Sequence, residues 1–258
     1  KLLAEVPAEL VITGIHIGHY GKDLEPQWTL SRLVAELLDK IPDVRFRLGS
    51  IEATEIDNLT IELLVTSGGQ LAPHLHMPLQ SGADPVLRLM RRWHTSEQYR
   101  LRVLEIADRI WPLGLGADVI TGFPGETPTD HAATSDLIRE LPFTYLHVFP
   151  FSPRDGTVAA GLPSPVPQRI AGERSRELRE MANDKGLEYR ESRVGENADI
   201  VVEGTSGTAL TGDYLRVGLV GLGAESNGLP EPRYRGTLQG DREHLYIEFP
   251  QKPAAILV

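Results

Sequence analysis

The chain has 258 residues, which is enough for one large domain and a second, smaller one. Its formal net charge of −10 argues against a broad electrostatic grip on nucleic acid. The lack of any cysteine excludes disulfides and cysteine-ligated iron–sulfur clusters within these residues. A cytoplasmic location is the default expectation for a chain without cysteine. No apolar run is long enough to span a membrane, so we expect no membrane partner. The sequence begins at Lys1 without a methionine, and we expect that an N-terminal part is missing.

Strands and helices are expected to alternate over the first 150 residues. Apolar segments typical of strands occupy residues 9–13, 43–48, 74–79, 116–121 and 143–151. Between them, capping residues and apolar spacing predict helices over residues 29–38, 57–66, 84–90, 96–110 and 127–141. A polar, glycine-containing loop follows each strand. This order predicts a parallel sheet that binds ligands at the carboxyl ends of its strands, and five strands make a partial, TIM-like barrel.

The stretch HLHMPLQSGADPVLRLMRRWHT, residues 74–95, joins one of these strands to the next helix. His74 and His76 share one face of the strand, because side chains alternate along it. Gln80 and Ser81 follow at the carboxyl end, which is the catalytic rim in a barrel of this kind. Asp84 is expected to cap the helix, with Pro85 in its first position.

The pattern changes in the last third of the chain. A proline-rich break at 162–168 precedes a highly charged segment, which we interpret as a solvated linker helix over residues 169–193. Short strands then predict a small all-β barrel or sandwich, namely ADIVVEG, DYLRVGL, RYRGTLQG and HLYIEF. Turns are expected at 204–207 and 221–228. The tail 251–258 is expected to be loosely held.

Three segments are candidates for chemistry. His74 and His76 form an HxH pair that, with Asp118 and His147 on other strands, fits either a metal-dependent barrel hydrolase or hydrogen-bonded core packing. The GFPGE loop, residues 122–126, offers free N–H groups at a helix start, although Glu126 also fits an ordinary first-turn acid. The glycines of GIHIGHYG, residues 14–21, permit either close approach to a ligand or a tight connection.

Five segments carry a resemblance to a known family. TGIHIGHYGKDL, RLGSIEATEI, HLHMPLQSGADPVLRLMRRWHT, DVITGFPGET and FPFSPRDGT occur in this order. Together they resemble the radical S-adenosylmethionine (SAM) methylthiotransferases over nearly all of residues 5–250. The form GIHIGHYG resembles the branch that acts on threonylcarbamoyl-adenosine beside the tRNA anticodon, the MtaB type. The terminal β domain resembles TRAM, the RNA-contacting barrel of these enzymes.

The resemblance implies a division of the chain and two cofactors. Residues 1–165 would form the radical SAM barrel from its second strand onward, 166–193 a linker helix, 194–250 the TRAM barrel and 251–258 a tail. The family cleaves SAM with a reduced [4Fe–4S] cluster and delivers a methylthio group from a second cluster. The CxxxCxxC loop that holds the first cluster would lie before Lys1, so we expect this portion alone to be inactive.

The resemblance also assigns residues to sites. SAM would contact Gly14, Ile15 and His16 at its methionine end, and Gly122, Phe123, Pro124, Gly125 and Glu126 near its adenosine. Further polar positions at the rim are Ser50, Glu52, Gln80 and Ser81. Arg154 is the candidate contact to substrate tRNA, and no residue is assigned a catalytic or metal-binding role. A metal-dependent hydrolase built on His74 and His76, and a non-catalytic RNA-binding protein, remain the alternatives.

Overall fold

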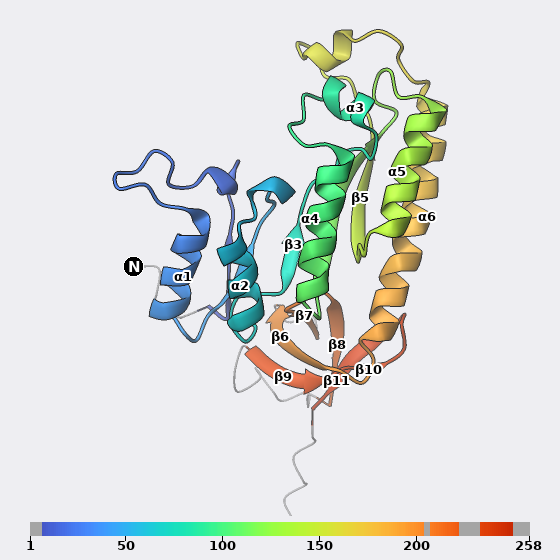
Figure 1. Ribbon diagram of the computed structural model, residues 1–258. Coiled ribbons are helices and arrows are strands. Elements are labelled where there is room, and N and C mark those ends of the chain that lie inside the picture. The colour runs from blue at the N-terminus through green and yellow to red at the C-terminus, as the bar shows by residue number, and fades with distance from the viewer. Residues whose placement is uncertain (1–6, 204–206, 222–232, 250–258) are drawn as a thin grey trace, which may run out of the picture.

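Five parallel strands form the first part of the structure. The computed structural model describes residues 7–203, 207–221 and 233–249 (Figure 1). The strands are β1 (Glu9–Ile12), β2 (Arg45–Leu48), β3 (His74–His76), β4 (Gly114–Thr121) and β5 (Tyr145–Pro150). β1 pairs with β2, and β3, β4 and β5 pair in that order. Isolated parallel bridges, Phe46 to Leu71 and Ser50 to His76, place β2 beside β3. The predicted partial parallel barrel is therefore confirmed.

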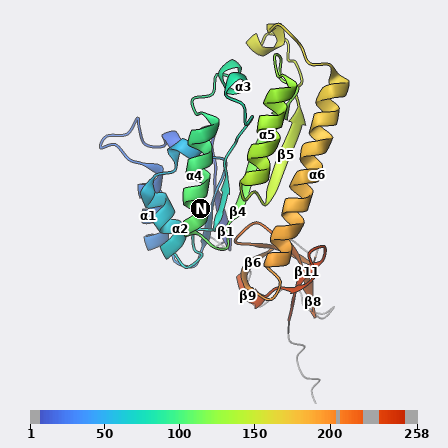
Figure 2. The same ribbon diagram turned by 45° about the vertical axis from the view of Figure 1, so that its right-hand side comes forward.

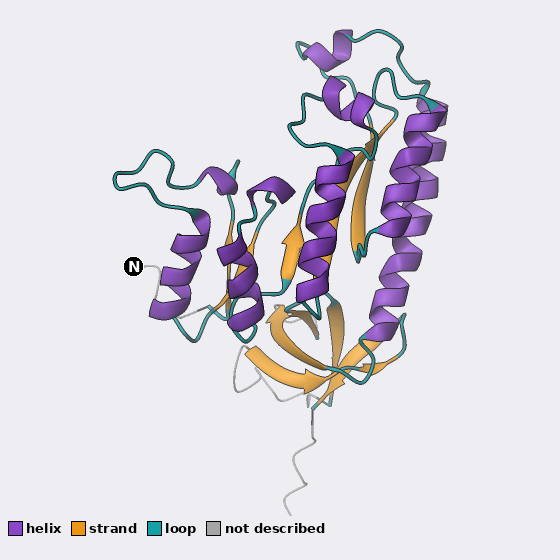
Figure 3. Cartoon of the chain, in the orientation of Figure 1, coloured by secondary structure: helices purple, strands orange, loops and turns teal. Residues whose placement is uncertain are grey.

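Helices alternate with these strands, as Figure 3 shows for the upper part of the molecule. They are α1 (Leu30–Lys40), α2 (Asn58–Thr66), α3 (Asp84–Leu89), α4 (Ser96–Arg109), α5 (Pro128–Glu140) and α6 (Gln168–Ser192), with 3₁₀ turns η1 (Ile17–His19), η2 (Ala53–Glu55) and η3 (Val158–Gly161). Thr29, Asp57, Thr95 and Thr127 cap the helices that follow them, because each side chain accepts a hydrogen bond from the backbone N–H three residues on. The predicted capping box of Thr95 and Gln98 is confirmed.

The start of α3 differs from the prediction by one residue. Ala83 occupies the N-cap position and makes no side-chain cap, while Asp84 is already helical. The Asp84 Oδ1 atom instead accepts a hydrogen bond of 2.7 Å from the Ser96 backbone N–H. Asp84 therefore ties the beginning of α4 to the beginning of α3, a partnership across the sequence that a local capping rule does not consider.

The two faces of the 74–79 segment separate as expected. Leu75, Met77 and Leu79 are completely buried in the main hydrophobic core between strands and helices. His74 and His76 lie on the opposite face, toward the inside of the open barrel, where both contact Tyr145. The barrel thus has a packed outer layer and a polar inner face.

Helix α6 is not the solvated linker that its composition suggested. Its bounds agree with the prediction, but it packs along β4 and β5, and Figure 2 shows it running beside β5 down to the β strands. One of its faces is buried, through Ala171, Arg174, Ser175, Leu178 and Ala182. The division of the chain at residues 165, 193 and 250 stays a prediction.

The last strands form a curled sheet, which confirms the predicted β domain. They are β6 (Asn197–Glu203), β7 (Thr208–Thr211), β8 (Arg216–Val220), β9 (Arg233–Thr237), β10 (Gln239–Gly240) and β11 (Leu245–Glu248). They pair in the order β10-β11-β8-β7-β6-β9, and β11 also lies against β9. Strand β7 was not predicted. Most of the expected turns at 204–207 and 221–228, and the tail 251–258, lie outside the described residues.

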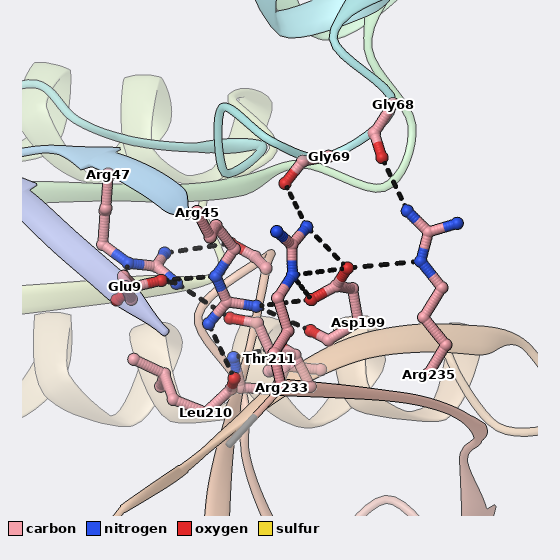
Figure 4. A network of polar contacts seen from close by, with 12 residues as sticks. Glu9, Arg45, Arg47, Gly68, Gly69, Asp199, Leu210, Thr211, Arg233 and Arg235 are labelled. Atoms are coloured by element: carbon pink, nitrogen blue, oxygen red, sulfur yellow. Dashed lines mark hydrogen bonds and ion pairs between the residues drawn. The ribbon is translucent and has the colours of Figure 1, made fainter. Parts of the chain in front are cut away.

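Arginine side chains join the two parts of the structure (Figure 4). The Arg45 side chain is completely buried, pairs with Glu9 and donates to the backbone oxygens of Asp199 and Leu210 at 2.8 and 3.0 Å. Arg47 donates to the oxygens of Thr211 and Gly212 at 3.0 and 2.9 Å. The amino ends of the barrel strands are therefore hydrogen-bonded to the β sheet, which leaves the carboxyl ends as the open rim.

Candidate functional site

The loop after β1 brings two histidines to one glutamate. Gly14 and Ile15 are exposed, and the Nε2 atoms of His16 and His19 lie 2.6 and 3.1 Å from Glu55 Oε1. The other Glu55 oxygen is buried and has no hydrogen-bond partner within the part of the chain that the structure describes. His16 was predicted from the sequence as a site residue, whereas Glu55 was not. Gly18 is a sequence signal for the close approach of Glu55, since any side chain there would collide with that carboxylate.

The loop after β2 places a carboxylate at the rim. Glu52 Oε1 lies 2.7 Å from Arg92 Nη1, and Glu52 Oε2 lies 3.7 Å from His94 Nδ1. Burial lowers the pKa of His94 despite the opposing effect of Glu52, and the His94 Nε2 atom has no partner among the described residues. Ser50 bridges to β3 at the same level. Glu52 was predicted at this site from the sequence, whereas Arg92 and His94 were not.

Gln80 and Ser81 have different surroundings. Gln80 adopts a left-handed conformation, with φ of 65°, and its backbone hydrogen-bonds to Asp118 and Ile120 of β4. A non-glycine residue held in this conformation is a feature of functional loops. Ser81 is fully buried, and its hydroxyl accepts from the Ala83 N–H. Both residues were expected to line the rim, and the Ser81 hydroxyl is occupied within its own loop.

The GFPGE loop is held by Glu126. Its Oε2 atom accepts hydrogen bonds from the Gly122 N–H at 2.6 Å and from Arg174 Nη1 at 2.5 Å, and its side chain is 1% exposed. Gly122 and Gly125 have positive φ, as a tight turn requires. Phe123 packs edge-on against Phe151, and Pro124 is buried. Arg174 was not predicted as a residue of this site from the sequence.

Two N–H groups of the helix start beyond this loop are taken up by side chains of the chain itself. Thr127 and Asp130 form a reciprocal capping box at the beginning of α5: the Asp130 N–H donates to Thr127 Oγ1, and the Thr127 N–H donates to Asp130 Oδ2. The Gly122 N–H is taken by Glu126. Glu126 is buried and bonded to Arg174, which lies on a different helix. It is therefore neither an exposed first-turn acid nor an open ligand.

Arg154 lies in the exposed loop after β5. Its backbone oxygen accepts hydrogen bonds from Thr157, at 3.1 Å from the backbone nitrogen and 2.7 Å from the hydroxyl. Its guanidinium makes no hydrogen bond or ion pair with the residues that the structure describes. The assignment of Arg154 as a contact to tRNA stays a prediction.

A second group of polar side chains lies inside the barrel. The Tyr145 hydroxyl is 2.8 Å from His74 Nε2 and 3.1 Å from His76 Nδ1. Asp118 Oδ1 lies 3.3 Å from both His76 Nε2 and His147 Nδ1, and hydrogen bonding from His76 is the main cause that lowers the pKa of Asp118. Of the residues suggested for a metal site, His76, Asp118 and His147 are brought together, whereas His74 is not part of that cluster.

Comparison with known proteins identifies relatives over most of the chain. Threonylcarbamoyladenosine tRNA methylthiotransferase MtaB of Bacillus subtilis is 38% identical over 196 residues, which are 76% of this chain and 43% of that protein. The protein of the same name from Rickettsia prowazekii is 36% identical, over 82% of this chain and 50% of that protein. A tRNA-2-methylthio-N(6)-dimethylallyladenosine synthase of Bacillus licheniformis is also 36% identical, over 80% of this chain and 40% of that protein.

Family models and solved structures give less information than these relatives. No protein-family model matches the chain. Among solved structures, the radical SAM enzyme coproporphyrinogen III oxidase (HemN) of Escherichia coli aligns with a TM-score of 0.49 and 18% identity, over 60% of this chain and 37% of that one. The chain spans about half the length of the curated relatives it matches, or somewhat less. Over that length, the relatives and the ordered motifs agree: the chain belongs to the radical SAM methylthiotransferase family.

Proposed function

We propose that this chain is the barrel and β portion of a cytoplasmic enzyme that adds a methylthio group to threonylcarbamoyl-adenosine next to the tRNA anticodon. The names of the relatives support a tRNA methylthiotransferase. Relatives of the threonylcarbamoyl-adenosine and dimethylallyl-adenosine branches differ little in identity to this chain, so the choice of branch rests on the GIHIGHYG segment. The β sheet would be the TRAM module that contacts RNA.

One observation carries this proposal. Segments far apart in the sequence that resemble the family motifs all follow the carboxyl ends of parallel strands, and they therefore meet at one rim. The loops after β1, β2 and β3 contribute Gly14, Glu52 and Gln80, and those after β4 and β5 contribute Gly125 and Arg154. The opposite end of the barrel is closed by the β sheet. A ligand thus has one polar end to approach.

The polar groups at the rim are of a type that can bind SAM, whereas no residue of the chain can ligate an iron–sulfur cluster. The Glu52 carboxylate, held by Arg92, can accept hydrogen bonds from an ammonium group, and the buried His94 Nε2 atom beside it is free for a polar partner. SAM, when bound, would supply the methyl group and the radical precursor. A [4Fe–4S] cluster needs thiolates, and the sequence has no cysteine.

The remaining rim residues have positioning roles in this proposal. Glu126 holds the GFPGE loop in place for the adenosine end of SAM through its bond to the Gly122 N–H. Gln80 is held by β4 in its strained conformation, with its backbone fixed at the rim. Arg154 would contact a tRNA phosphate, which suits a chain whose overall charge is negative and whose RNA contacts must be local.

A hybrid enzyme tests the proposal. The N-terminal portion of the Bacillus subtilis relative, up to the position that matches residue 7, would be joined to this chain and expressed in a strain that lacks its own threonylcarbamoyl-adenosine methylthiotransferase. We expect methylthiolated threonylcarbamoyl-adenosine in the digested tRNA, measured by mass spectrometry. A Glu52→Gln hybrid should lose most of this product.

The controls separate the possible failures. The intact relative must restore the product, and the purified hybrid must contain its iron and be monodisperse. A folded, iron-loaded hybrid that makes no methylthiolated nucleoside would contradict the proposal. A hybrid that modifies dimethylallyl-adenosine instead would retain the enzyme class and overturn the choice of branch.

A further inference from the structure

Three neighbouring strands present a cluster of ligand-type side chains to the inside of the barrel. His76 comes from β3, Asp118 from β4 and His147 from β5. Asp118 and His147 are directly opposite each other in the β4–β5 pair, and His76 lies two residues below Asp118 in the register of the β3–β4 pair. All three fall on the inner face, because side chains alternate along each strand.

Two of the three distances between these ligand atoms match the edges of a four-coordinate metal centre. Asp118 Oδ1 is 3.3 Å from His76 Nε2 and 3.3 Å from His147 Nδ1, and all three atoms lie within 4.8 Å of one another. A tetrahedral zinc site with arms of about 2.0–2.1 Å has ligand-to-ligand edges of about 3.3 Å. We propose that His76, Asp118 and His147 form a binding site for a divalent transition-metal ion of the zinc type.

The surroundings of His76 suit a metal ligand. Its Nδ1 atom is 3.1 Å from the Tyr145 hydroxyl, which is itself 2.8 Å from His74 Nε2. A hydrogen bond to the second ring nitrogen fixes the orientation of a ligating histidine. Tyr145 reaches both histidines by leaning across β4 at Gly116, where any side chain would collide with its ring. The glycine is thus the residue that makes this arrangement possible.

The three ligands leave one position open toward the barrel interior. The His147 side chain is 53% exposed and that of Asp118 is 29% exposed, whereas His76 is 10% exposed. An ion can therefore enter from the His147 side and keep a fourth ligand, either water or a polar group of a bound molecule. The three ligand side chains are not among the residues assigned to SAM, and the proposed metal site does not require the proposed methylthiotransferase activity.

A competing cluster supplies the internal control. His16, His19 and Glu55 also bring three ligand atoms within 4.8 Å of one another. However, Glu55 Oε1 lies only 2.6 Å from His16 Nε2, which is a hydrogen-bond distance and too short for two ligands of one ion. Both histidines are about half exposed on a loop, and the described residues give neither of them a second hydrogen-bond partner that would fix its ring.

The test uses the whole chain, without an affinity tag and stripped with a chelator. Zn²⁺ binding is measured by competition with a chromophoric chelator, and Co²⁺ is added separately to record its visible spectrum. The absence of cysteine means that any four-coordinate cobalt spectrum must come from nitrogen and oxygen ligands. We expect one ion per chain, released by acid because the imidazoles must be unprotonated to bind.

Variants locate the site. His147→Ala, whose parent side chain is half exposed, should weaken Zn²⁺ binding by more than the roughly 10–100-fold that changes around a metal site cost. Asp118→Asn should weaken Zn²⁺ binding to the same extent. Tyr145→Phe should weaken it by a factor within the range of roughly 10–100-fold. The His16→Ala/His19→Ala double variant should bind like the parent. Circular dichroism of each variant confirms that it is folded.

Two results would overturn the proposal. Binding that survives in a folded His147→Ala variant and disappears in the His16→Ala/His19→Ala variant would place the ion at the loop. A parent chain that binds no Zn²⁺ at micromolar concentration would show that the three side chains form a hydrogen-bonded group only. Methylthiolation by the hybrid enzyme is a separate measurement, so the two proposals fail independently.

Discussion

The pair of Glu126 and Arg174 shows how a single residue differs from its sequence interpretation. A local pattern placed Glu126 at a helix start, either as a ligand or as a solvated acid. In the structure it is buried and bonds both to the Gly122 N–H and to a guanidinium from α6. Nothing in periodicity or capping rules reveals a partner 48 residues away. Burial of two charges together is tolerated only because they satisfy each other.

Glu126→Gln is expected to destabilise the chain by about 3–5 kcal/mol, because it leaves the Arg174 charge buried without a counter-charge. Urea unfolding measures the change in the free energy of unfolding, provided that the dependence of this free energy on urea concentration is the same in the variant and the parent. The double variant Glu126→Gln/Arg174→Met should regain part of the loss, because it removes the orphaned charge. A double variant less stable than Glu126→Gln would contradict the assignment of an ion pair.

His94 makes the stability depend on pH. Burial lowers its pKa in the folded chain, so the unfolded chain binds more protons as the pH falls through 6.5, its ordinary pKa. Its contribution to stability is therefore complete above pH 6.5 and is lost as the solution becomes more acidic, by at most about 1.4 kcal/mol per pH unit. Denaturant titrations between about pH 7.5 and about pH 5.5 measure this slope.

The matched variants for this pH dependence are His94→Gln and His244→Gln. His94→Gln cannot titrate and should show a shallower decline in unfolding free energy than the parent. His244 has a side chain that is 84% exposed, and its variant should follow the parent curve. Equal slopes for the parent and His94→Gln would show that another group is responsible.

At the scale of elements, most of the parallel barrel could be predicted from the sequence. The alternation of strands and helices, the caps at Thr29 and Thr127 and the polar loops at strand ends were all readable locally. Strand β7 was missed because its four residues, TALT, are too few to show a clear alternation of apolar and polar side chains. Its place is set by pairing with β6 and β8. The N-cap of α3 was misplaced by one residue because Asp84 bonds to another helix.

The charged helix α6 was misjudged for a physical reason. Its average composition is that of a solvated helix, yet it buries a face that itself contains Arg174. Composition averages over all faces, so it does not reveal that Ala171, Leu178 and Ala182 line up against the sheet. The helix belongs to the outer layer of the barrel by its contacts.

Leu178→Ala is expected to cost about 2–5 kcal/mol, because the side chain is completely buried in the main core. Arg176→Ala, at an exposed position on the same helix, should change stability by no more than about 0.5 kcal/mol. Thermal and urea unfolding of both variants measure the difference. If the two variants were equally stable, α6 would be a solvated linker after all.

The whole molecule is held together at the amino ends of the barrel strands. Arg45 and Arg47 reach into the β sheet, while Arg233 and Arg235 pair with Asp199 and donate to the backbone oxygens of Gly69 and Gly68 in the barrel. Arginines of the barrel thus donate to the β sheet, and arginines of the β sheet donate to the barrel (Figure 4). The sequence could predict two units, but no local pattern indicated that arginines on β2 would be buried between them.

Arg45→Met is expected to weaken this junction by on the order of 3 kcal/mol, because three hydrogen bonds, from Nη1 and Nη2 to Asp199 and Leu210, are lost. The two parts should then unfold in separate transitions, seen as different midpoints for the β sheet and the barrel in hydrogen exchange. Arg169→Met removes an exposed pair on α6 and should leave a single transition. A single transition in Arg45→Met would show that other contacts couple the parts.

Tyr214 has a wider consequence for the relation between the two parts. It lies between β7 and β8, with φ of 69°, and its ring stacks 4.3 Å from His74 and lies 5.2 Å from Tyr145. A residue of the β sheet thus contributes to the floor of the barrel. Exchanging the β sheet for that of a relative would therefore also replace a side chain that packs against His74 and Tyr145 at the floor of the barrel.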